Sequence, residues 1–157
     1  MLLGTGQTSI DSRDNTGRTS LSLAAAKRNE AVVNILLDTG RADINSSDSA
    51  GRTPLYWAAG KGHVNVVSSL VDSRNADINV RDQDGFSPFM RAVWRSNKEV
   101  VRILLQTGLL SNHSCMDGLF YQAFWFMLAD ELDQFMVNIG YAVGNDFFGL
   151  RGLFGEL

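Results

Sequence analysis

The chain is 157 residues long, which suits a single domain, and its 45% apolar and 20% charged residues are typical of a folded globular protein. Its formal net charge of −3, from 14 Lys and Arg against 17 Asp and Glu, argues against nucleic acid as a partner, because phosphate binding favours a basic excess. With one cysteine and two histidines, the chain offers neither an internal disulfide nor enough ligands for a zinc site. We therefore expect an intracellular protein, in the cytoplasm with the nucleus as an alternative.

The same short motifs recur every 34 residues, which is the signature of a repeat protein. Asp14, Asp48 and Asp82 share this spacing, and a glycine stands three positions after each of them. Because such a unit cannot bury its apolar face alone, we expect the units to stack on their neighbours. The three units follow one another without a gap and occupy residues 14–47, 48–81 and 82–108.

The first 13 residues match the end of such a unit. Segment 2–6 aligns with segment 36–40, which lies 34 positions downstream and ends on the same Thr-Gly pair. We therefore interpret residues 1–13 as a partial N-terminal repeat and the array as a truncation of a longer one. An in-frame stop codon just before Met1 in the transcript would contradict this hypothesis.

Each unit has the same internal order of local signals. An Asp-x-x-Gly segment comes first and predicts a tight hairpin tip, because Asp accepts hydrogen bonds from nearby amides and Gly takes positive φ. Thr19, Thr53 and Ser87 then precede a short helix with small residues, which a hydroxyl can cap. A second helix with apolar residues at helical spacing follows. Each unit is therefore predicted to be a pair of antiparallel helices with a short hairpin loop.

The second unit resembles the consensus of a known family, the ankyrin repeats. The resemblance rests on Gly51-Arg52-Thr53-Pro54-Leu55, the paired Ala58-Ala59 and the Gly62-His63 step. It implies an all-α ankyrin-repeat solenoid, and the wording of segment 37–45 resembles arrays common in filamentous fungi. The family's first-helix histidine is replaced here by Ser22, Tyr56 and Met90, which leaves the hydrogen bonding at this position open.

The composition changes after Gly108. Segment 109–157 holds seven of the nine phenylalanines and six acidic residues against one basic residue. Three interpretations stay open: a divergent helical cap on the third unit, an unstructured sequence from a translated intron or shifted reading frame, and a segment that docks on a membrane or a partner. A deletion of 109–157 that leaves solubility and the unfolding midpoint unchanged would contradict the first.

No group of residues predicts catalysis. Cys115 and His113 lie two positions apart, a spacing that seldom forms a nucleophile–base pair. The acidic cluster at 130–133 is typical of a helix start or a solvated face rather than of a metal site. We therefore predict no enzymatic activity, no cofactor and no metal.

The resemblance instead implies a non-catalytic protein–protein interaction module, either an adaptor or the recognition portion of a larger signalling protein. In that family the hairpin tips and the exposed side of each first helix form a concave binding face. Carried over by repeat position, this face comprises Asn15, Thr16, Arg18, Lys27, Ser49, Ala50, Arg52, Lys61, Gln83, Asp84, Phe86, Trp94 and Arg95, with Ala26 and Gly60 beside them.

Two features of this face suggest how it would bind. Lys27, Lys61 and Arg95 recur at one repeat position, which predicts a basic stripe that selects an acidic segment of a partner or the acidic tail of the chain itself; the alternative is ordinary solvated surface. Phe86, Trp94 and Arg95 are residue types that dominate interface energetics. The alternative for Trp94 is packing under the aromatic tail.

Two further functions remain as alternatives. The chain is then either a remnant of a longer ankyrin protein with no independent function, or a membrane-associated adaptor that uses its aromatic tail. Liposome co-sedimentation distinguishes the second. The predicted partner is another protein rather than nucleic acid, a membrane is disfavoured, and the oligomeric state is left open.

Overall fold

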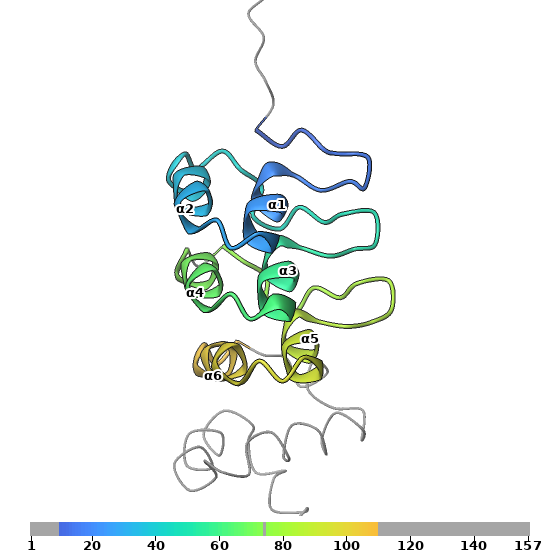
Figure 1. The fold of residues 1–157 in the computed structure, drawn as a ribbon, viewed down its shortest axis with the longest axis vertical. Helices are drawn as coiled ribbons and strands as arrows, with labels where there is room; N and C mark the ends of the chain where they lie inside the picture. The colour runs from blue at the N-terminus through green and yellow to red at the C-terminus, as the bar shows by residue number, and fades with distance from the viewer. Residues whose placement is uncertain (1–9, 74, 110–157) are drawn as a thin grey trace, which may run out of the picture.

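A computed structural model describes residues 10–73 and 75–109, and every regular element within these ranges is a helix. The prediction of an all-α solenoid is confirmed for this part of the chain (Figure 1). Residues 1–9 and the predicted tail, apart from Leu109, lie outside the described residues. The helices form three consecutive pairs: α1 (Ser20–Ala26) with α2 (Glu30–Asp38), α3 (Pro54–Lys61) with α4 (Val64–Asp72), and α5 (Pro88–Trp94) with α6 (Lys98–Gln106).

The first helix of each pair begins at the predicted hydroxyl residue. Oγ1 of Thr53 accepts a hydrogen bond from the backbone N–H of Tyr56 at 3.2 Å, and this bond satisfies one of the free amides at the start of α3. Pro54 follows at the first helical position, where its missing N–H costs no hydrogen bond. Thr19 and Ser87 cap α1 and α5 in the same way.

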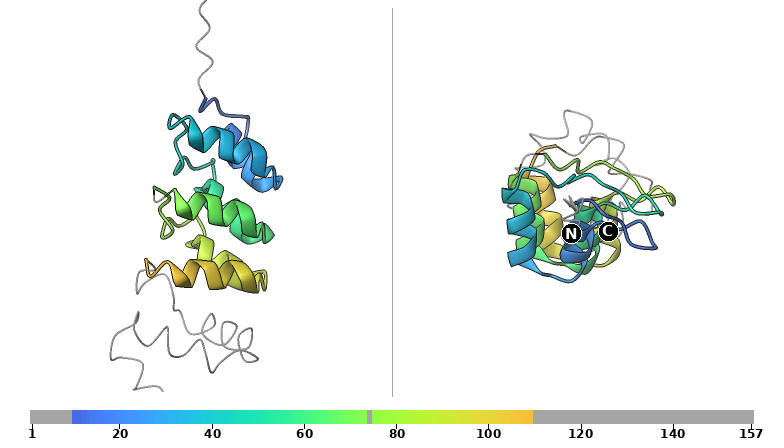
Figure 2. Two further views of the ribbon diagram at one scale, coloured as in Figure 1. Left: turned by 90° about the vertical axis from the view of Figure 1, so that its left-hand side faces the viewer. Right: turned by 90° about the horizontal axis from the view of Figure 1, so that it is seen from above.

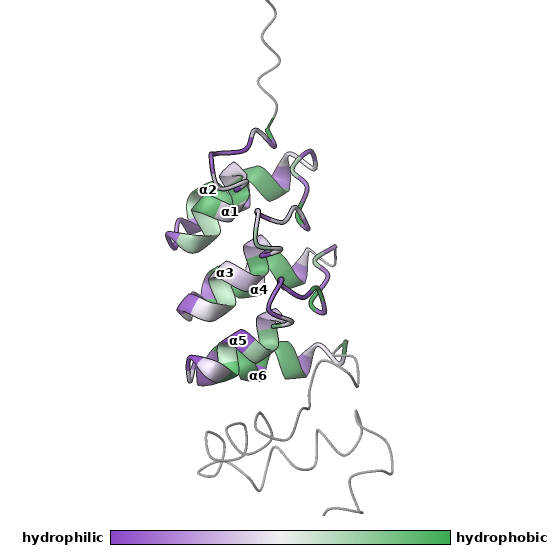
Figure 3. Ribbon diagram, turned by 90° about the vertical axis from the view of Figure 1, so that its right-hand side faces the viewer, coloured by the Kyte–Doolittle hydropathy of each residue, from purple (hydrophilic) through white to green (hydrophobic). Residues whose placement is uncertain are grey.

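The helices stack in two layers. In one layer α3 packs between α1 and α5, and in the other α4 packs between α2 and α6 (Figures 1 and 2). Ala25, Ala59 and Ala92 are fully buried, and their small side chains let the first helices approach closely. Figure 3 shows hydrophobic residues concentrated in the helices and largely hydrophilic loops. The largest buried side chains of the core are Leu21, Val33, Leu55, Val66, Val67, Leu70, Val100, Val101 and Leu104.

The upstream side of α2 is less covered than the same side of the later helices. Val32 of α2 is 37% exposed and Leu36 is half-buried, whereas the equivalent Val66 and Leu70 of α4 are fully buried against the preceding pair. Within the described residues, only the segment 10–13 precedes the first hairpin. The first pair therefore presents an apolar stripe that the second and third pairs bury.

That short segment is nevertheless bound in register. A carboxylate oxygen of Asp11 accepts a hydrogen bond from the backbone N–H of Asp43 at 3.1 Å. Thirty-four positions downstream, Oδ1 of Asn45 accepts one from the backbone N–H of Asp77 at 2.8 Å. The residues before the first hairpin thus contact the first repeat as residues 44–47 contact the second.

Candidate partner-binding face

The residues predicted to bind a partner lie along one side of the stack. They come from the three hairpins and from the ends of α1, α3 and α5, and the hairpins project away from the layer of α2, α4 and α6 (Figures 1 and 2). Arg18, Ala50, Arg52 and Phe86 are half-buried. The exposed members are Asn15, Thr16, Lys27, Ser49, Lys61, Gln83, Asp84, Trp94 and Arg95.

Each hairpin is closed by its own aspartate, as the Asp-x-x-Gly pattern predicts. Oδ1 of Asp14 accepts hydrogen bonds from the Thr16 hydroxyl at 2.7 Å and from the backbone N–H groups of Thr16 and Arg18 at 2.8 and 3.0 Å. These donors, led by the Thr16 hydroxyl, hold the pKa of Asp14 well below its ordinary value. Asp48 and Asp82 accept from the amides at the same two positions of their own hairpins.

Neighbouring hairpins are joined to one another through the backbone. The N–H of Ser49 donates to the carbonyl oxygen of Thr16, and the N–H of Gln83 donates to that of Ala50, both at 3.0 Å. Gly51 has a φ of +81°, and a Cβ atom there would lie 3.2 Å from the backbone of the next hairpin. Only glycine suits this turn and this close approach. The bonds fix the spacing of the hairpin tips.

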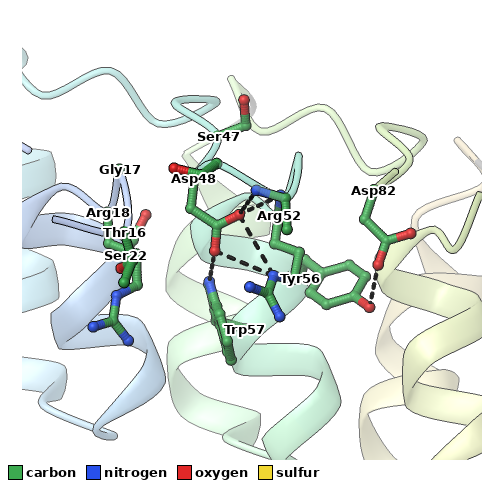
Figure 4. Close-up of polar contacts among 12 residues, drawn as sticks. Thr16, Gly17, Arg18, Ser22, Ser47, Asp48, Arg52, Tyr56, Trp57 and Asp82 are labelled. Atoms are coloured by element: carbon green, nitrogen blue, oxygen red, sulfur yellow. Dashed lines mark hydrogen bonds and ion pairs between the residues drawn. The ribbon is translucent and has the colours of Figure 1, made fainter. Parts of the chain in front are cut away.

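The middle of the face is built around Trp57 of α3 (Figure 4). Its indole Nε1 donates to Oδ2 of Asp48 at 3.2 Å, and Nε of Arg52 lies 3.2 Å from the same oxygen. The guanidinium carbon of Arg52 stands 4.4 Å from the centroid of the Trp57 ring, within cation–π range. The ammonium of Lys61 lies 6.0 Å from the same ring.

Trp57 was not among the residues selected from the sequence. Its repeat position is occupied by Leu23 in the first unit and by Arg91 in the third. A position that changes from aliphatic to aromatic to basic across otherwise regular repeats is a signal of a surface that does not serve packing alone. The selection by hairpin tip and helix end passed over it.

Tyr56 resolves the question left by the missing histidine. Its hydroxyl donates to Oδ2 of Asp82 at 2.6 Å, so the first helix of the second repeat is tied to the hairpin of the third (Figure 4). Burial of the phenol, followed by this bond to a carboxylate, raises the pKa of Tyr56 well above its ordinary value. At the equivalent position Ser22 accepts a hydrogen bond only locally, from the hydroxyl of Thr19 at 3.3 Å.

An aromatic pair stands at the downstream end of the face. Phe86 of the third hairpin and Trp94 of α5 meet edge to face, with ring centroids 6.1 Å apart and planes at 83°. Trp94 exposes 64% of its surface, a large fraction for the residue type that contributes most apolar area. The third repeat therefore presents a large aromatic surface beside the exposed Arg95.

The basic residues of the face fall into two groups. Arg18 and Arg52 form ion pairs with the aspartates of their own hairpins, at 2.9 and 3.2 Å, so their charges are partly neutralised within the molecule. Lys27, Lys61 and Arg95 are exposed, at the one repeat position that the sequence indicated. The positive charge available to a partner is therefore concentrated in the second group.

Within residues 10–73 and 75–109, no three His, Cys, Asp or Glu side chains gather where they could hold a metal ion. In the same part of the chain, no helix combines the length and the apolar character needed to cross a membrane. Cys115, His113 and the acidic cluster at 130–133 lie outside the described residues.

Comparison with known families agrees with this architecture. A family model described as "Ankyrin repeat" matches residues 16–49, and one described as "Ankyrin repeats (3 copies)" matches residues 40–115. No curated protein matches the chain. The two matches together span residues 16–115, more than half of the 157 residues, and they include all six helices. The chain therefore belongs to the ankyrin-repeat family.

Proposed function

We propose that the chain is a non-catalytic adaptor, or the recognition portion of a larger signalling protein, and that it holds a segment of its partner against the hairpins and the first-helix layer. Ankyrin repeats are generally protein–protein interaction modules. The proposal adds a location for the contact and a chemical preference for the partner.

The observation that carries the proposal is the exposed aromatic pair of the third repeat. Phe86 and Trp94 pack edge to face, and Trp94 keeps 64% of its surface exposed beside Arg95. Aromatic and arginine side chains that become buried on binding commonly supply most of the binding free energy of an interface. Because the hairpins are joined by backbone hydrogen bonds, the surface is ordered before a partner arrives, which lowers the entropic cost of association.

The charge of the face favours an acidic segment as the bound element. Lys27, Lys61 and Arg95 are exposed at successive repeats, along the direction in which the helices stack. Such a row attracts a chain with spaced carboxylates and raises the rate of association at low ionic strength.

The test compares partner capture by the full-length chain and by two variants. Phe86→Ala with Trp94→Ala removes the aromatic pair, and Ile35→Ala serves as the control because Ile35 is 62% exposed on α2, in the other layer of the stack. We expect the double variant to lose the partner, with an increase in Kd of about 30-fold or more. The control should bind within about twofold of the wild type.

Equal unfolding midpoints for the three proteins would establish that the comparison reports binding and not folding. Undiminished capture by the double variant would contradict the proposed location of the binding face.

A further inference from the structure

We propose that Arg91 is the anchor of a carboxylate-binding subsite at the junction of α3 and α5, and that it receives an Asp or Glu side chain of the partner protein. This inference rests on the proposed function, since it places one specific contact within the binding face. Arg91 was not selected from the sequence, because it occupies the repeat position of Trp57 rather than a hairpin tip or a helix end.

The side chain of Arg91 is held in place by the neighbouring repeat. A Cβ atom on Gly60 of α3 would lie only 2.8 Å from Cγ and 3.5 Å from Nε of Arg91, so the arginine stem lies directly on the surface that this glycine leaves bare. The guanidinium carbon then stands 5.8 Å from the centroid of the Tyr56 ring, within cation–π range. The arginine is therefore positioned across the junction of the two repeats rather than extended into solvent.

The guanidinium of Arg91 has donors to spare. Arg18 and Arg52 spend theirs on the aspartates of their own hairpins, but no hydrogen bond or ion pair joins the Arg91 guanidinium to any residue in ranges 10–73 and 75–109. The acid across the junction, Asp82, is already bonded to the Tyr56 hydroxyl and to two backbone amides. A planar, half-buried guanidinium with unused donors matches the two oxygens of a carboxylate.

The surroundings of this subsite are also positive. The ring of Trp57, on the same helix as Gly60, lies 4.4 Å from the Arg52 guanidinium carbon and 6.0 Å from the Lys61 ammonium. Of these cations, Arg52 is offset by Asp48, whereas Lys61 is exposed and has no ion pair with a described residue. A second carboxylate of the same segment is thus favoured beside the one on Arg91. Charge complementarity therefore selects an acidic peptide segment.

The experiment titrates the full-length chain at low salt with a labelled 12-residue peptide of alternating Glu and Ser, and reads binding by fluorescence anisotropy. The same peptide with Gln in place of Glu reports whether the carboxylate charge is required, and inorganic phosphate tests for unselective anion binding. Arg91→Gln removes the anchor, Arg91→Lys keeps the charge but loses the planar fork, and Gly60→Ala displaces the arginine stem. Arg41→Gln is the matched control, because Arg41 is exposed after α2 and loses the same charge.

We expect Arg91→Gln to weaken binding of the Glu peptide by about tenfold or more, and Arg91→Lys and Gly60→Ala to weaken it by several-fold, while Arg41→Gln stays within about twofold. The Gln peptide should not bind, and phosphate should not compete at concentrations comparable to those of the peptide. Equal binding by Arg91→Gln and wild type, no binding of the Glu peptide to the wild type, or equal competition by phosphate would each overturn the subsite.

The two proposals can fail separately. If Arg91→Gln binds the Glu peptide as the wild type does while the Phe86 and Trp94 variant still loses its partner, the subsite is wrong and the binding face stands. If the peptide result is as expected but the aromatic variant captures the partner normally, the aromatic contact is wrong and the subsite stands.

Discussion

Tyr56 shows how a single residue can join two repeats. The sequence indicated only that the family's histidine is absent at this position. In the structure the longer tyrosine side chain reaches the next hairpin and donates to Asp82, whereas Ser22 is too short to leave its own helix start. Side-chain reach across a repeat boundary depends on the distance between stacked units, and a one-dimensional pattern does not contain that distance.

Replacement of Tyr56 by Phe tests this link. The variant keeps the buried ring but leaves the Oδ2 atom of Asp82 without its hydroxyl donor, so we expect the free energy of unfolding to fall by about 1–3 kcal/mol. Urea denaturation followed by far-UV circular dichroism measures the change. An unchanged midpoint would mean that water replaces the hydroxyl without cost.

The same variant predicts a difference in alkaline stability. The pKa of Tyr56 is raised on folding, so the folded state holds the phenolic proton more tightly than the unfolded state, whose tyrosines titrate near pH 10. The stabilisation is therefore fully present below about pH 10 and is lost as the pH rises above it. Between pH 8 and 11 the unfolding midpoint of the wild type should fall more than that of Tyr56→Phe. Parallel curves would contradict the raised pKa.

The sequence located most of the candidate face but not its centre. Position-by-position transfer found the hairpin tips and the exposed pair Phe86 and Trp94, because those positions are the same in every repeat. It missed Trp57 and Arg91, whose importance depends on partners in the hairpin or in the neighbouring repeat. Contacts of that kind arise only once two repeats are stacked.

Among the elements, the first helices were the easiest to predict. A hydroxyl residue followed by proline or by an apolar run marks where a helix starts, and Thr19, Thr53 and Ser87 all cap helices as expected. The second helices follow a different rule at their start. His63 and Asn97 do not cap α4 and α6 through their side chains. They contact carbonyl oxygens of the preceding first helix instead, and local sequence rules do not anticipate that choice.

Removal of one cap measures the value of a helix start. Thr53→Ala deletes the oxygen that accepts the N–H of Tyr56 in a site that is almost fully buried, so we expect a loss of about 1–2 kcal/mol in the free energy of unfolding. Ser20→Ala is the control, because Ser20 is exposed at the first position of α1 and alanine favours a helix. Its effect should stay within about 0.5 kcal/mol. Equal losses in the two variants would show that the cap has no special role.

At the scale of the whole molecule, the 34-residue period was sufficient to predict a stack of paired helices. Repeat proteins gain stability from neighbour contacts, and here α3 packs against both α1 and α5. The middle repeat is therefore expected to couple the other two. The period did not predict which parts of the surface remain uncovered, since that depends on what lies beyond each end of the array.

Two equivalent leucines test the coupling. Leu21 and Leu55 lie 34 positions apart and are each 1% exposed, so substitution by alanine removes the same packing in the first and in the middle repeat. Each change should cost about 2–5 kcal/mol locally. We expect Leu55→Ala to reduce amide hydrogen-exchange protection in both neighbouring repeats. Leu21→Ala should leave α5 and α6 protected.

Uniform loss of protection in both leucine variants would instead indicate that the described repeats unfold as one unit. In that case the middle repeat has no special position, and nearest-neighbour coupling alone does not describe the stack.

The partly uncovered stripe on α2 bears on how this architecture tolerates change in length. Val32 and Leu36 have the places that α4 fills with Val66 and Leu70, and Asp11 already forms the bond that Asn45 forms one repeat later. An in-frame duplication of 34 residues would therefore meet matching partners on both of its sides and lengthen the protein without rebuilding its interior. A duplication of any other length would break the succession of hairpins. Growth of this gene by tandem copying is constrained to whole multiples of one module.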